Sequence, residues 1–132
     1  MEGCDGTLDG APGELTVRRY QRFGDGGAAV VWAEATAIAE DARMHPRQLW
    51  LAEHTQAAIG EMIALCRKAH REANGTAEGL LVGLQLTHSG RYSYRRPQLA
   101  VHDPVLDPLT VDHSTGRAIG DDWPLLTDDD LK

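Results

Sequence analysis

The chain has 132 residues, of which 42% are hydrophobic and 25% are charged. These values are typical of one soluble globular domain and exclude the disordered and fibrous classes. The formal net charge of −7 repels phosphate backbones and anionic lipid surfaces, which argues against nucleic acids and membranes as partners.

The two cysteines, Cys4 and Cys66, are far apart in the sequence. Their spacing matches neither a disulfide framework nor a structural zinc site, so we expect no metal. The first 13 residues lack the apolar run of a secretory signal, and no segment approaches the roughly 18 consecutive apolar residues of a membrane span. We therefore expect a soluble protein in the reducing cytoplasm.

Residues 3–13 contain four glycines, two aspartates and a proline, which is the composition of a turning loop. A short helix is predicted next, with Thr16 as its N-terminal cap and its end in the glycine-rich residues 24–27. The apolar, β-branched run at residues 28–33 predicts a strand buried on both faces.

After an irregular stretch at residues 35–54, apolar positions recur at helical spacing over residues 55–73, and Asn74-Gly75 supplies a left-handed stop. A second buried strand is predicted at residues 80–86. The order strand, helix, strand is a βαβ unit, which pairs its two strands in parallel.

Beyond residue 91 the sequence predicts a long loop over residues 92–126, because prolines, aspartates and glycines interrupt every periodic pattern. Thr127 and the three aspartates after it are typical of a helix N-terminus. The arginines at positions 91, 95 and 96 indicate either an ordinary solvated loop or a contact with an anionic ligand.

Three segments resemble, in order and spacing, the Old Yellow Enzyme family of NADH:flavin oxidoreductases. They are MEGCDG at residues 1–6, GGAAVVWAEATA at residues 26–37 and QLTHSGR at residues 85–91. The last of these follows an apolar strand and is the most specific of the three.

The resemblance implies an α/β fold, a partial (β/α)8 TIM barrel that covers about the first three βα units. Residues 1–91 would form the βα core of this N-terminal fragment, and residues 92–132 a long loop and the start of a truncated helix. Members of the family bind FMN and pass hydride from NAD(P)H through the flavin to an electron-poor alkene or related acceptor. Most of that active site has no counterpart in this chain, so we expect no activity unless the missing barrel half is supplied by oligomerisation or by another chain.

By the same resemblance, Met1, Ala35 and Gln85 would contact the flavin. An amide such as that of Gln85 both donates and accepts hydrogen bonds, which suits the mixed edge of a flavin ring. A glutamine in an apolar strand needs a partner, either this ligand or an internal group. The small side chain of Ala35 would allow close approach of a planar ring, although an alanine here can equally be an ordinary loop residue without a functional role.

We expect Arg91 and Tyr92 to contact substrate, with Tyr94 and Arg95 as further candidates, although Arg91 can instead fix its loop. Glu34 is expected to pair with an arginine or a backbone N–H rather than to act in catalysis, and His88 to orient its loop through a ring nitrogen. No catalytic residue is assigned.

A second hypothesis makes the chain a non-catalytic remnant that acts as a folding or protein-interaction module through its exposed strand edges. Whether the chain is an enzyme by itself stays open at this stage. A small metal-binding protein is a third idea, but its histidines lack ligand spacing.

Overall fold

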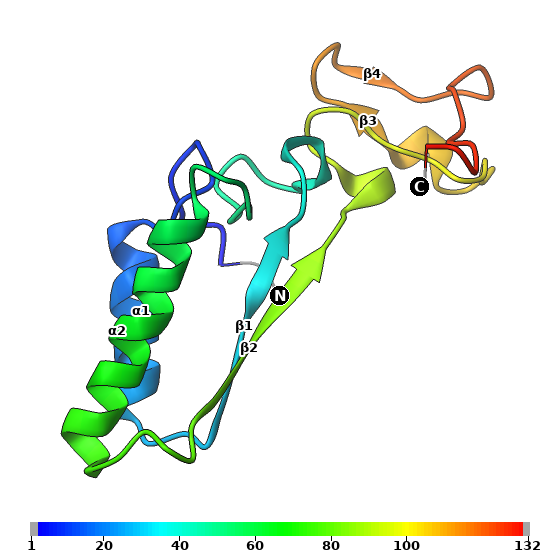
Figure 1. The fold of residues 1–132 in the computed structure, drawn as a ribbon. Coiled ribbons are helices and arrows are strands. Elements are labelled where there is room, and N and C mark those ends of the chain that lie inside the picture. Colours follow the sequence, from blue (N-terminus) through cyan, green and yellow to red (C-terminus); the bar gives the residue numbers. More distant parts are fainter. Residues whose placement is uncertain (1–2, 131–132) are drawn as a thin grey trace.

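A computed structural model describes residues 3–130 (Figure 1). Helices α1 (Glu14–Asp25) and α2 (Gln56–Asn74) lie together on one side of a parallel pair of strands, β1 (Val30–Ala37) and β2 (Leu81–Thr87). The segment after β2 extends beyond the carboxyl ends of these strands. It contains a two-residue antiparallel ribbon of β3 (Val111–Asp112) and β4 (Arg117–Ala118).

The partial TIM barrel with three βα units is wrong, because the described chain is a small mixed α/β structure with two helices and two-stranded sheets. The predicted βαβ unit is confirmed: β1, α2 and β2 follow in that order, and the strands pair in parallel. Residues 3–13 add no strand because their backbone bonds are made locally and to a loop. Gly6 donates its N–H to the carbonyl of Arg47 at 3.0 Å, and Thr7 to that of Ala11 at 2.9 Å.

Helix α1 packs against α2 through a stripe of small and aromatic side chains at helical spacing, Thr16, Tyr20 and Gly24. Thr16 is not the N-terminal cap. That position belongs to Gly13, whose N–H donates to Thr16 Oγ1 at 3.2 Å. The predicted ends are confirmed, because α1 stops at the glycines after residue 25, and Gly75 caps α2 at φ 82°.

The two strands are not buried on both faces. In β1, Val31 and Ala33 pack in the core with Tyr20 and Leu49, whereas Val30 and Trp32 are 56% and 68% exposed. The burial of β1 therefore alternates over residues 30–33, as expected where a sheet is covered on one side only, whereas residues 35–37 are all buried. A register shift between Trp32 and Ala35 marks a β-bulge in this strand.

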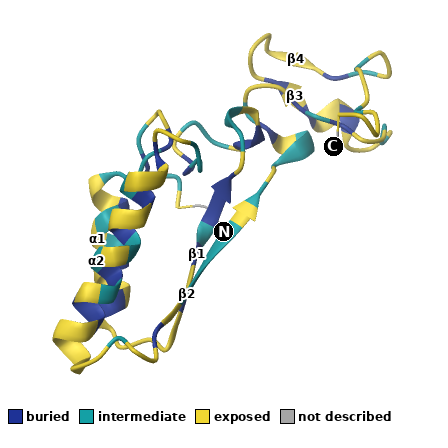
Figure 2. Cartoon of the chain, viewed as in Figure 1, coloured by how far each residue is buried: buried dark blue, intermediate teal, exposed yellow. Residues whose placement is uncertain are grey.

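The segment after β2 is mostly irregular, as predicted, and largely exposed (Figure 2). A buried arginine, Arg43, attaches it to the N-terminal loop and to the loop before α2. Arg43 donates to the carbonyls of Leu8 and Pro46 and to the Tyr94 hydroxyl, and its guanidinium lies over the rings of Trp50 and Tyr94.

The predicted C-terminal helix is absent from the described residues. Residues 127–130 form a turn instead, in which the Asp130 carboxylate accepts the N–H and the hydroxyl of Thr127.

Candidate functional site

The two predicted flavin contacts that lie in the described chain are direct neighbours. Ala35 in β1 and Gln85 in β2 are register partners near the carboxyl ends of the parallel strands, the end at which open α/β sheets bind ligands. Met1, the third predicted contact, lies outside the described residues. The structure thus brings together residues that are 50 positions apart in the sequence.

Gln85 is half-buried, yet its side chain forms no hydrogen bond with any residue of the range 3–130. Gln48 shows the opposite behaviour. It is fully buried, its Oε1 accepts the Met44 N–H at 2.7 Å, and its Nε2 donates to the Ala35 carbonyl at 3.1 Å. Because a half-buried amide is expected to find partners, the Gln85 amide remains available for a ligand.

Gln85 borders an open pocket of about 430 Å³, within the size range of small-molecule sites. Its walls come from β1, from the adjacent face of α1 and from the N-terminal segment, and most of its surface is apolar. The other lining residues are Gly3, Arg19, Tyr20, Phe23, Trp32, Ala33 and Glu34.

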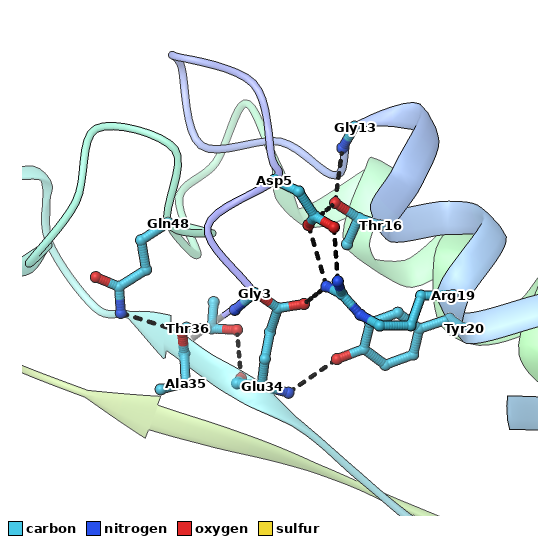
Figure 3. A network of polar contacts seen from close by, with 10 residues as sticks. All are labelled: Gly3, Asp5, Gly13, Thr16, Arg19, Tyr20, Glu34, Ala35, Thr36 and Gln48. Carbon is cyan, nitrogen blue, oxygen red and sulfur yellow. Dashed lines mark hydrogen bonds and ion pairs between the residues drawn. The ribbon is translucent and has the colours of Figure 1, made fainter. Parts of the chain in front are cut away.

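The polar wall of this pocket is an ion-pair network (Figure 3). Arg19 contacts Asp5 at 2.6 Å and Glu34 at 2.5 Å, and Glu34 also accepts the Gly3 N–H at 2.6 Å. The expectation that Glu34 pairs with an arginine or a backbone N–H is confirmed on both counts. The network connects the N-terminal segment to α1 and β1. Within it, the positive charge of Arg19 is neutralised by Asp5 and Glu34.

The network also shifts proton affinities. Partial burial alone would raise the pKa of Asp5, but hydrogen bonds from Arg19 and Thr16 outweigh it and lower that pKa. For Arg19, burial opposes the charge, yet the carboxylates of Asp5 and Glu34 raise its pKa. Asp5 and Arg19 are therefore both charged at neutral pH.

Tyr20 was missed by sequence reasoning, although its spacing from Thr16 and Gly24 marks the buried stripe of α1. Its hydroxyl accepts the Glu34 N–H at 2.8 Å. Burial raises the pKa of Tyr20 to about 12. The phenol therefore stays neutral and caps a backbone donor at the β-bulge.

The predicted substrate residues lie elsewhere. Arg91 is ion-paired with the buried Asp107 and donates to the Val101 carbonyl at 2.9 Å, so it fixes its own loop. Tyr92 is 64% exposed. Both line a second cavity of about 240 Å³ that does not include Gln85.

The other loop candidates have structural partners. Tyr94 contacts Arg43, and Arg95 pairs with Glu40 at 2.8 Å. His88 Nδ1 accepts the Gly90 N–H at 3.0 Å, which agrees with its predicted role in orienting the loop.

Among residues 3–130 no group of three or more histidine, cysteine or acidic side chains is arranged to hold a metal ion. No helix in this range is both long and apolar enough to cross a bilayer. A scan against protein-family models gives no match, and a search of curated protein sequences gives no significant match. The family resemblance therefore remains a prediction.

Proposed function

We propose that this chain contributes one wall of an FMN site in an NAD(P)H:flavin oxidoreductase of the ene-reductase type. The observation that carries the proposal is the unsatisfied Gln85 amide beside Ala35, at the carboxyl ends of two parallel strands and facing an open pocket. Support also comes from the motif at residues 85–91, because the family resemblance implies that its first residue, Gln85, contacts the flavin.

The fit to a flavin is partial. The Gln85 amide can donate to and accept from one edge of the ring system, and Trp32 adds an exposed aromatic surface to the same pocket. Arg19 is the cation in this pocket, and it is already neutralised by Asp5 and Glu34, so the described residues provide no phosphate site there. We therefore propose that a second polypeptide completes the site.

Bound FMN would supply hydride transfer from NAD(P)H to an electron-poor alkene or related acceptor. In this chain Gln85 would orient the ring through its amide. Ala35 is 2% exposed and does not line the pocket, so its role would be to pack beneath Gln85 as its neighbour in the sheet. We propose that Tyr92 contacts the acceptor from the second cavity, and that Arg91, paired with Asp107, holds this loop in place.

The test is co-expression of this chain with the C-terminal part of a flavin oxidoreductase of the family it resembles. Purified complexes are titrated with FMN while flavin absorption and fluorescence are recorded. Gln85→Ala should weaken FMN binding about tenfold, the loss of one to two hydrogen bonds. Gln56→Ala, which truncates an exposed glutamine at the start of α2, should bind like the wild type. Failure of every pairing to retain flavin, or equal affinity of the two variants, contradicts the proposal.

A second candidate function is a flavin-independent interaction module. The observation that favours it is the open apolar face of the sheet, on which Val30, Trp32 and Leu81 are each more than half exposed. This hypothesis expects self-association or binding to another protein that added FMN does not change. A monomer that unfolds cooperatively and binds nothing argues against it.

A further inference from the structure

The face of α1 that points away from α2 carries a second surface, independent of the Gln85 amide. Leu15, Arg18, Arg22 and Phe23 lie on it with spacings of three, four and one residues, and Leu15 and Phe23 are 52% and 42% exposed. Leu15, Arg18 and Arg22, three and four residues apart, form one ridge along the helix, and Phe23 lies beside this ridge on the side of β1. Leu15 and Phe23 thus flank the two arginines along the helix.

These two arginines lack charge partners. Neither Arg18 nor Arg22 forms an ion pair with a carboxylate among the described residues, whereas the neighbouring Arg19 contacts two. Like charges four residues apart on a helix repel each other by a few tenths of a kcal/mol. In a chain of net charge −7, this ridge is a local positive surface.

This surface is hollowed on both sides of Phe23. One concavity, of about 420 Å³, runs along α1 between Leu15 and Arg22, and its lining includes the paired Asp5 and Arg19. A second, of about 330 Å³, lies between Phe23 and the exposed Val30 and Trp32 of β1. Apolar side chains of an occupant can enter both concavities, while its charged groups meet the arginines.

We infer that this surface docks an amphipathic helix of a partner polypeptide, one whose apolar stripe is flanked by glutamate or aspartate. The ridge spacing suits a packed helix, and the unpaired arginines select carboxylates over cations. The inference does not depend on flavin. It specifies the chemistry of a partner on a surface that shares Phe23 and Trp32 with the pocket beside Gln85 but does not include Gln85.

The probes are three synthetic helical peptides that share leucines at positions i, i+3, i+4 and i+7 and differ in the flanking residues, which are glutamate, glutamine or lysine. Binding to the full chain is measured by calorimetry. The glutamate peptide should bind about tenfold more tightly than the lysine peptide at low salt, and this ratio should fall as salt is added.

The double variant Arg18→Glu/Arg22→Glu should reverse the preference, so that the lysine peptide binds more tightly. Phe23→Ala should weaken all three peptides. Arg71→Glu, a charge reversal at an exposed position of α2, serves as the matched control and should change nothing. Circular dichroism verifies that each variant is folded.

Three results would overturn the inference. One is equal binding of the glutamate and lysine peptides, or binding of neither. The second is concentration-dependent dimerisation that the double variant abolishes, which would make a second copy the occupant. The third is binding to phosphatidylserine vesicles without binding to the glutamate peptide.

Discussion

At the level of single residues, side chains rather than a third strand form hydrogen bonds with the backbone in the carboxyl half of β1. The Tyr20 hydroxyl takes the Glu34 N–H, and the Gln48 amide supplies a donor to the Ala35 carbonyl. Side chains from α1 and from the loop before α2 thus satisfy polar groups that a further strand would otherwise bond.

Tyr20→Phe should lower the free energy of unfolding by about 1–3 kcal/mol, because it leaves the Glu34 N–H without its acceptor while keeping the ring in place. Urea denaturation measures the change. Tyr92→Phe removes a hydroxyl from a side chain that is 64% exposed and should leave stability unchanged. Equal midpoints for the two variants would show that the Tyr20 contact contributes nothing net.

Among the elements, the contact between α1 and α2 depends on one glycine. A Cβ atom built on Gly24 would lie 2.2 Å from the carbonyl oxygen of Cys66 and 3.0 Å from the Ala69 side chain. Because the nearest atom is helix backbone, the two helices would have to separate. The close packing of this layer therefore requires glycine at position 24.

Gly24→Ala should destabilise the protein by about 1–3 kcal/mol or more through overpacking. Gly60→Ala is the matched control, since a Cβ there meets nothing within 4 Å. In the interior of α2 this change should stabilise by about 0.5–1 kcal/mol through better helix propensity. Thermal melts that shift in the same direction for both variants would refute this description of the helix contact.

For the whole molecule, the Asp5, Arg19 and Glu34 network joins the N-terminal segment, α1 and β1. Its contribution depends on pH. The pKa of Asp5 is lower in the folded chain than in the unfolded chain, so the unfolded state takes up a proton first as pH falls. The stabilisation by Asp5 is thus complete above about pH 4 and is lost as pH falls further, through the folded pKa.

Asp5→Asn should be less stable than wild type at pH 7 by about 1–2 kcal/mol, because Arg19 loses a charged partner. The difference should shrink as the pH falls from 5 to 2. Chemical denaturation at a series of pH values, with Asp25→Asn at the exposed end of α1 as control, measures both effects. A constant difference across this range would rule out titration of Asp5 as the cause.

Local patterns were sufficient for the helices, their glycine stops and the parallel βαβ unit, because hydrophobic periodicity and turn chemistry act over a few residues. The pairing of Glu34 and the role of His88 also followed from residue type. The motif at residues 85–91 led to Gln85, which the structure places beside Ala35.

Tertiary contacts decided the rest. Burial on one face of β1 and β2 depends on which layers are present, and the apolar run at residues 28–33 has the same composition whether one face or two are covered. Arg43, Gln48 and Tyr20 form hydrogen bonds with partners 13 to 51 positions away in the sequence. Periodicity and turn motifs extend over only a few residues and cannot predict such contacts. The proposed flavin contact, the proposed acceptor site and the proposed arginine surface likewise depend on groups that folding brings together or leaves unpaired.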